Sequence, residues 1–126
     1  MRKVMAVVIS AAAVLALAAA PASAGGREVR REGSCSAASD WKLKVKADGA
    51  RLELEFEVDQ NVVGDTWRVR VFQNGDRIFA GNRTTQAPSG SFELSLRPAD
   101  SAGSDRFVAK ARNVSTDETC RGALTF

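Results

Sequence analysis

Basic side chains alternate with small apolar ones in two stretches of this chain, and they are the residues with the clearest potential for chemistry. Arg68 and Arg70 are separated by one valine, and Lys110 and Arg112 by one alanine. A spacing of two residues places side chains on one face of a β-strand. Guanidinium and ammonium groups bind carboxylates and phosphates, and guanidinium can do so through two parallel hydrogen bonds. The pattern therefore predicts basic strand faces suited to an acidic partner.

The side chains needed for common catalytic and metal-binding chemistry are largely absent. The chain has no His, which removes Ser-His-Asp and Cys-His catalysis in their usual forms and His-ligated zinc or copper sites. It also contains no GxSxG motif and no Gly-rich phosphate loop. Glu53, Glu55 and Glu57 could act as paired acid and base, but their alternation opposite lysines is typical of solvated cross-strand pairs. We therefore expect no enzymatic activity, no catalytic residues, no cofactor and no metal.

Acidic residues also gather at predicted turns, where oxygen ligands can bind calcium. Their spacing matches no calcium-binding loop, and Asp is a common turn residue. The pattern therefore indicates turns and not a calcium site. These acidic residues are Asp40, Asp59, Asp65, Asp117 and Glu118.

The strongest structural signal is Trp41–Val58, which predicts the hairpin against which the rest of the domain packs. Apolar residues occupy every second position on both sides of Asp48-Gly49, as in strands with one buried face. Asp-Gly favours a two-residue type I′ turn, which sets the register. The predicted pairs are Ala47–Ala50, Val45–Leu52, Leu43–Leu54 and Trp41–Phe56 on the buried face, and Lys44–Glu53 and Lys42–Glu55 on the exposed face.

Further strands follow over residues 67–71, 78–85, 91–97, 106–112 and 119–126. Asn74-Gly75 marks another hairpin, for which two registers are open. A two-residue loop sets Val71 against Ile78, whereas a three-residue loop with a bulge sets Val71 against Phe79. No stretch of the predicted mature chain has the period of an amphipathic helix. The predicted fold is therefore all-β, a seven-stranded antiparallel two-sheet sandwich, with an open barrel as the alternative.

The first 24 residues resemble a cleavable signal peptide. A basic start, Met1–Lys3, precedes an apolar run, and Ala22-Ser23-Ala24 fits the small-residue cleavage rule. A membrane anchor is the alternative, although the run is short and Ala-rich for a stable span. The Ala-rich leader is typical of bacteria. We expect a secreted protein, extracellular or associated with the cell envelope, with no membrane span in the mature chain.

Residues 25–40 are polar and aperiodic, so they are predicted to form a flexible N-terminal arm, and residues 41–126 the sandwich domain. Cys35 and Cys120 both lie in the exported part, and one disulfide between them is the simple interpretation. It would close a loop of roughly 85 residues, and the chain-entropy model predicts that such a bond stabilises the folded state by about 4–5 kcal/mol. Loss of Arg2 and Lys3 lowers the net charge from +3 to +1, so overall charge favours no particular partner and no specific nucleic acid.

The order of the predicted strands resembles an immunoglobulin-like or fibronectin type III domain over residues 38–126. Trp67 opens the third predicted strand, where immunoglobulin domains carry a buried Trp. Ala109-Lys-Ala-Arg-Asn113 is similar to the end of the sixth strand in fibronectin type III domains. The chain has no Tyr and therefore no tyrosine corner, and the predicted disulfide does not join the second and sixth strands. The resemblance implies a topology and no particular function.

That topology would bring the basic residues together. If the third, fourth, sixth and seventh strands share a sheet, its outer face collects five basic groups with Val108 and Phe72 among them, while the other outer face is charge-balanced by lysines and glutamates. We expect a secreted, non-catalytic binding or interaction module that docks an acidic polymer or protein through this face. One alternative is a solvated face without a ligand. Another is a secreted inhibitor of an extracellular enzyme, with Gln86–Gly90 as its exposed loop. The five basic residues are Arg68, Arg70, Lys110, Arg112 and Arg121.

Overall fold

The computed structural model describes residues 26–126, which form eight β-strands and no helix. The predicted signal peptide, residues 1–24, lies outside the described residues. Within residues 26–126 no helix has the length and apolar character needed to cross a membrane. The strands are β1 (Glu28–Ser34), β2 (Asp40–Asp48), β3 (Arg51–Asp59), β4 (Thr66–Gln73), β5 (Asp76–Thr84), β6 (Ser91–Leu96), β7 (Arg106–Asn113) and β8 (Thr119–Thr125).

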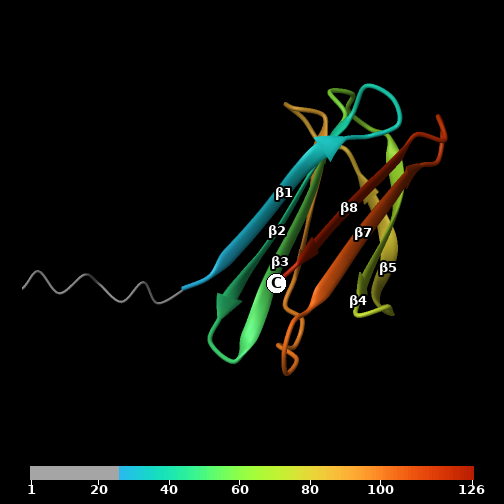
Figure 1. Cartoon of the computed structure of the whole chain (residues 1–126). Coiled ribbons are helices and arrows are strands. Elements are labelled where there is room, and N and C mark those ends of the chain that lie inside the picture. Colours follow the sequence, from blue (N-terminus) through green and yellow to red (C-terminus); the bar gives the residue numbers. More distant parts are fainter. Residues whose placement is uncertain (1–25) are drawn as a thin grey trace, which may run out of the picture.

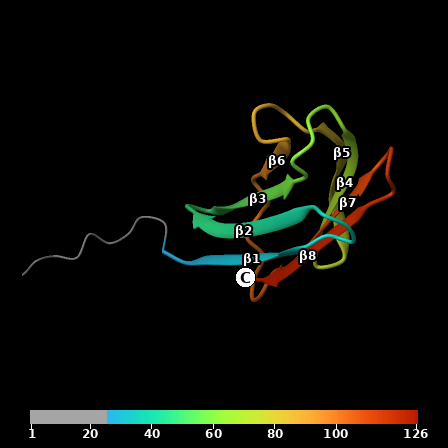
Figure 2. The same cartoon turned by 90° about the horizontal axis from the view of Figure 1, so that it is seen from above.

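The strands form two antiparallel sheets that pack face to face. One sheet has the order β1-β2-β3-β6 and the other β5-β4-β7-β8. Figure 1 shows the two layers side by side, and Figure 2, seen from above, shows β1 beside β8 at one margin and β6 near β5 at the other. The two sheets are separate, so the predicted sandwich is confirmed and the open barrel is wrong. The predicted sheet of the third, fourth, sixth and seventh strands corresponds to β4, β5, β7 and β8.

Alternation along the strands explains what fills the space between the sheets. Every second residue points inward, and burying each large apolar side chain contributes roughly 1.5–3 kcal/mol. Trp67 is fully buried, as predicted, with its ring centroid 6.2 Å from that of Phe92. The core residues are Leu43, Val45, Leu52, Leu54, Phe56, Val58, Trp67, Val69, Val71, Phe92, Leu94, Phe107, Ala109, Ala111, Cys120, Leu124 and Phe126.

The flexible arm predicted over residues 25–40 is wrong for residues 28–34, which form β1 and raise the strand count from seven to eight. β1 pairs with β2 along its whole length. The register puts Val29, Arg31 and Gly33 opposite inward-facing β2 residues, and only one of these three is a large apolar residue. The strand therefore has almost no hydrophobic period, and its main-chain bonds to β2 hold it in place. Residues 35–39 do lie outside strands.

The hairpin of β2 and β3 turns one residue later than predicted. Its central residues are Gly49 and Ala50, because Asp48 pairs with Arg51. Of the two, only Gly49 has a positive φ, at 61°. A type II′ turn places Gly at the first central position, whereas type I′ needs a positive φ at both. The predicted Asp-Gly turn is therefore wrong, and the conformational freedom of Gly49 decides where the chain reverses.

This later turn changes every cross-strand partner without changing the buried face. Each partner moves by two residues, and side chains of a strand alternate with a period of two. Lysines of β2 therefore do pair with glutamates of β3, as predicted, but each lysine has a different glutamate as its partner. Lys44 lies 2.8 Å from Glu55, and Lys46 lies 3.4 Å from Glu53.

The hairpin of β4 and β5 has the second of the two registers, with Val71 opposite Phe79. Asn74 and Gly75 form a two-residue turn in which both residues have a positive φ, 51° and 87°. The register then shifts next to Val71, which leaves Ile78 exposed and returns Phe79 to the inner face. The loop length and the bulge were therefore linked incorrectly in the prediction, because the bulge lies in the strand and not in the loop.

The disulfide predicted between Cys35 and Cys120 is confirmed, with an S–S distance of 2.04 Å. It joins the segment after β1 to β8, and thus one sheet to the other at the margin seen in Figure 2. A bond of this kind is typical of proteins in oxidising compartments.

Candidate functional site

The strand register brings the five predicted basic residues onto one surface, which we call the basic face: Arg68, Arg70, Lys110, Arg112 and Arg121. β4 and β7 pair directly, so Arg68 lies opposite Arg112 and Arg70 opposite Lys110. β8 pairs with the other side of β7 and sets Arg121 opposite Lys110. Strands are about 4.8 Å apart and alternate residues about 6.6–7 Å apart along a strand. The basic face is therefore a compact grid of positive charge.

An open hollow of about 720 Å³ lies over this grid and is lined by all five basic side chains. β5 contributes Ala80, Gly81 and Asn82 to its lining, and β8 adds Thr119. Ala80 and Gly81 have small side chains, so the hollow is shallow on the β5 side. The Asn82 amide and the Thr119 hydroxyl supply hydrogen-bonding groups. No Asp or Glu is among the lining residues. All ionisable groups that line the hollow are therefore positively charged.

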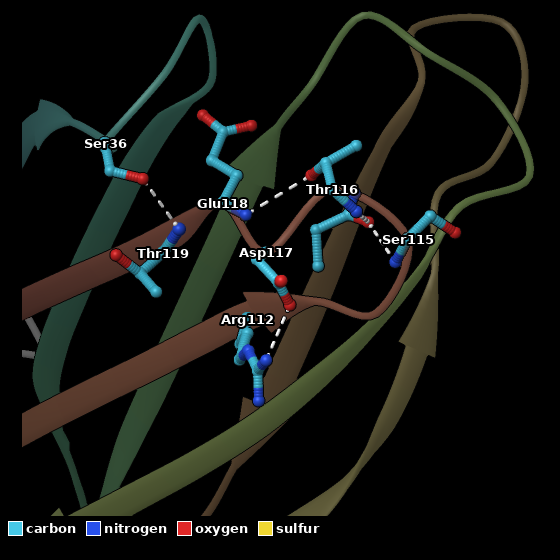
Figure 3. Close-up of polar contacts among 8 residues, drawn as sticks. Ser36, Arg112, Ser115, Thr116, Asp117, Glu118 and Thr119 are labelled. Atoms are coloured by element: carbon cyan, nitrogen blue, oxygen red, sulfur yellow. Dashed lines mark hydrogen bonds and ion pairs between the residues drawn. The ribbon is translucent and has the colours of Figure 1, made fainter.

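Only one of the five cations has a carboxylate within 4 Å among residues 26–126. Arg112 Nη2 lies 2.6 Å from Asp117 Oδ1 at the rim, as Figure 3 shows. Lys110 extends over an aromatic ring, with Nζ 5.5 Å from the centroid of Phe72. Phe72 and its cross-strand partner Val108 are half-buried beside the charges, as predicted. The remaining arginines are exposed and free to contact a partner.

The arrangement of like charges opposes folding stability. Cross-strand neighbours of like charge destabilise a sheet, and pairs of opposite charge stabilise it by roughly 0.2–1 kcal/mol. The other sheet follows the stabilising pattern, with Lys44 next to Glu55 and Lys46 next to Glu53. The Lys44–Glu55 contact raises the pKa of the lysine and lowers that of the glutamic acid. On the basic face, none of the five residues has a carboxylate as its cross-strand partner.

A polar network fixes the ends of the two strands that carry most of the basic face. Asp65 Oδ2 accepts hydrogen bonds from the side-chain amides of Gln60, at 2.6 Å, and Asn113, at 3.0 Å. The indole of Trp67 donates to Gln60 Oε1 at 3.0 Å. The two amides hold the pKa of Asp65 below its ordinary value. Because Trp67 lies opposite Asn113, this network locks the register that places Arg68 beside Arg112.

The turn between β7 and β8 positions the rim of the hollow. Asn113 Oδ1 accepts hydrogen bonds from the main-chain N–H groups of Ser115 and Thr116. Asp117 adopts a positive φ of 60° and contacts Arg112. Figure 3 shows the contact between Arg112 and Asp117 together with the bond from the Glu118 N–H to Thr116 Oγ1. The turn is thus tightly held and orients Arg112.

Four of the five acidic turn residues accept hydrogen bonds or pair with a cation, and the fifth, Asp40, lies opposite Asp59. Glu118 accepts from the main chain of Ala37 and from both the N–H and the hydroxyl of Ser39. Asp59 accepts from the N–H of Asn61. Within the described part of the chain, no group of three or more acidic or Cys side chains is placed to hold a metal ion. These carboxylates organise the loops between strands.

Sequence reasoning missed the neutral part of the hollow. Asn82 lies opposite Arg68 and Ala80 opposite Arg70, and Thr119 lies opposite Arg112. Ala80 and Asn82 are two residues apart, so the sequence places them on one face of β5. Matching them to Arg70 and Arg68 requires the register of the β4–β5 hairpin. The bulge beside Val71 determines that register, and the sequence left it open.

Comparison of the chain with models of known protein families, with curated proteins and with solved structures found no match. The fold and the basic face therefore define the class of protein as a disulfide-linked antiparallel β-sandwich with a strongly basic sheet surface.

Proposed function

We propose that this protein is a secreted, non-catalytic binding module that docks an acidic polymer or protein through its basic face. One observation carries the proposal: three adjacent strands place five basic groups opposite one another around a hollow without a lining carboxylate. Guanidinium groups recognise carboxylate, phosphate or sulfate groups in a bidentate manner. A grid of this kind fits a row of anionic groups better than it fits one small anion.

The division of the strands between the two sheets is compatible with an immunoglobulin-like topology. Counted without β1, the first, second and fifth strands (β2, β3 and β6) form one sheet. The third, fourth, sixth and seventh strands (β4, β5, β7 and β8) form the other. Immunoglobulin-like domains set their first, second and fifth strands against the third, sixth and seventh, and variable-type domains extend the second group. Trp67 and Asn113, the residues that carry the resemblance, are both fully buried. In this interpretation β1 is an additional edge strand.

Secretion is part of the proposal and has its own test. The leader pattern and the disulfide both favour export into an oxidising compartment. The intact mass of the exported protein should correspond to a chain that begins at Gly25 and carries one disulfide. A retained leader or two alkylatable thiols in the native protein would contradict this part.

The binding test uses polyglutamate, polyphosphate and dextran sulfate as anionic probes. Replacement of Arg68, Arg70 and Arg112 together by Ser should weaken binding by roughly a hundredfold, because each basic group beside an anionic surface contributes about 1 kcal/mol. Binding should fall steeply with salt, since exposed charges are screened within about 8–10 Å near physiological ionic strength. Replacement of the same arginines by Lys should retain only part of the affinity.

The matched control replaces Lys42, Lys44 and Lys46 by Ser. It removes the same charge from the opposite sheet and should bind the probes nearly as well as the original protein. Circular dichroism should show that both variants are folded. If the two triple variants bind alike, the basic face is a solvated surface and the proposal fails.

The inhibitor alternative rests on the loop between β5 and β6. Ala87, Pro88 and Ser89 are exposed, and the loop is closed by main-chain bonds from Gln86 N to Ser91 O and from Gly90 N to Gln86 O. A rigid exposed loop is the usual shape of a protease inhibitor. Inhibition of a panel of extracellular proteases, lost on substitution of Pro88, would favour this alternative.

A further inference from the structure

The outer face of the other sheet carries an excess of negative charge, and the prediction that it is charge-balanced is wrong. The correction comes from β1 and β6, which add carboxylates on either side of β2 and β3. Nine acidic and five basic residues of these four strands occupy outward positions in the register. The acidic residues are Glu28, Glu32, Asp40, Asp48, Glu53, Glu55, Glu57, Asp59 and Glu93, and the basic ones are Arg30, Lys42, Lys44, Lys46 and Arg51.

The excess is concentrated at one end of the sheet, on a surface that we call the acidic face: Glu32, Asp40, Glu57, Asp59 and Glu93. Glu57 lies opposite Glu93, and Asp40 opposite Asp59. A hollow of about 460 Å³ is lined by four of the five and by Lys42. None of these carboxylates belongs to an ion pair within residues 26–126. Lys42 is the cross-strand neighbour of both Glu32 and Glu57, and no other basic residue lies opposite any of the five carboxylates.

The two faces match in charge and in spacing. Both lie on antiparallel sheets, so their charges occupy grids with the same intervals, about 4.8 Å between strands and about 6.6–7 Å along each strand. With Lys42 among the five carboxylates, the acidic face keeps a net negative charge, opposite in sign to that of the basic face. Complementary potentials of this kind steer association and fix its orientation.

We propose that the partner of the basic face is the acidic face of a second copy of this chain. This inference rests on the proposed function, because it uses the same basic face and names its occupant. The two faces lie on opposite sides of the sandwich (Figure 2), so the contact is head to tail. A head-to-tail contact that does not close into a ring leaves one free face at each end, and the assembly grows into a linear chain.

Salt-dependent sedimentation of the purified protein tests the inference. At about 20 mM salt the weight-average mass should rise with protein concentration through dimers to longer species, and at about 0.5 M salt it should return to that of a monomer. The basic-face variant, in which Arg68, Arg70 and Arg112 are replaced by Ser, should remain monomeric. The acidic-face variant, Glu57→Gln with Asp59→Asn and Glu93→Gln, should also remain monomeric.

Mixing the two variants gives the sharpest outcome. Each variant keeps one intact face, so together they should form a one-to-one complex that does not grow further. A control with the same charge change elsewhere, Glu28→Gln with Asp76→Asn and Asp100→Asn, should assemble like the original protein. The inference is overturned if the original protein is monomeric at low salt, if the acidic-face variant still assembles, or if the mixture forms no complex.

The failure of this inference is distinguishable from failure of the proposed function. The acidic-face variant retains the basic face and should bind polyglutamate as the original protein does. If polyglutamate binds but no assembly forms, the second copy is the wrong partner and the basic face still docks another acidic surface. If neither occurs, both proposals fail.

Discussion

The indole of Trp41 on β2 lies directly against Gly122 on β8. A Cβ atom at residue 122 would stand 2.7 Å from Trp41 Cε3, closer than such atoms approach in proteins. Gly33 on β1 flanks the same ring, with an equivalent Cβ distance of 2.7 Å to Trp41 Cζ2. The two glycines thus make room for one aromatic ring at the margin where β1 meets β8, next to the disulfide. Trp41 joins the two sheets here.

Substitution of Gly122 by Ala should therefore destabilise the protein. At an uncrowded strand position the same change stabilises by roughly 0.5–1 kcal/mol, whereas overpacking costs about 1–3 kcal/mol. We expect the second effect to win, as measured by chemical denaturation. In a Trp41→Leu background the crowding is relieved, and Gly122→Ala should become neutral or stabilising. Equal effects in both backgrounds would show that Trp41 does not crowd residue 122.

Replacement of Trp67 by Ala should lower the free energy of unfolding by roughly 3–5 kcal/mol, because it leaves a large cavity between the sheets. Trp67→Phe leaves a smaller cavity and removes the bond to Gln60 Oε1, so it should cost less. Val63→Ala serves as a surface control, since Val63 is exposed, and should change stability by less than about 0.5 kcal/mol. A loss below about 1 kcal/mol for Trp67→Ala would contradict its role in the core.

Which parts of this structure could be predicted depends on where the physical signal lies. Strands β2, β3, β4, β6, β7 and β8 alternate apolar and polar residues because each covers the same core, and a period of two is readable without a structure. The positions of Arg68, Arg70, Lys110 and Arg112 follow from that period. Their meeting on one face required in addition the order of the strands, which the resemblance to immunoglobulin-like domains supplied.

The errors arose where main-chain conformation, and not side-chain burial, determines structure. β1 has a single large apolar residue at its inward positions, so its pairing with β2 is invisible in the hydrophobic pattern. Asp48-Gly49 suits one turn type, and Gly49-Ala50 suits another, with the same buried face in both cases. Without β1 and without the pairing of β3 with β6, the acidic face could not be assembled from the sequence.

Removal of the disulfide by Cys35→Ser with Cys120→Ser should destabilise the protein by at most about 4–5 kcal/mol. The effect should be greatest in β1, which pairs with a strand on one side only. Hydrogen exchange should accelerate over residues 28–34 more than over β2 and β3, because the tether of β1 to β8 would be reduced to the bond from Ser36 N to Thr119 O and nearby contacts. Uniform acceleration in all strands would show that the bridge does not act locally.

The buried carboxylate of Asp105 should make stability depend on acid pH. Burial acts to raise the pKa of Asp105, but hydrogen bonds from the N–H of Ser101 and from the side-chain amides of Gln73 and Asn74 outweigh it and lower that pKa. A carboxyl group with a lowered pKa in the folded state stabilises the protein above its unfolded pKa of about 3.9, and this contribution is lost as the pH falls further. Stability measured by urea denaturation should therefore decline from about pH 4 downward.

The variant Asp105→Asn separates this carboxylate from the other acidic groups. An amide cannot accept hydrogen bonds through both of its polar atoms, so one donor at the site is left without a partner at a cost of roughly 1–3 kcal/mol at neutral pH. The variant should also lose part of the decline in stability below about pH 4, because residue 105 no longer titrates. Asp100→Asn, which changes an exposed residue of the same loop, should leave both the neutral stability and the decline nearly unchanged. If Asp105→Asn shows the full decline of the original protein, the acid sensitivity arises from other carboxylates and not from the one that closes the loop between β6 and β7.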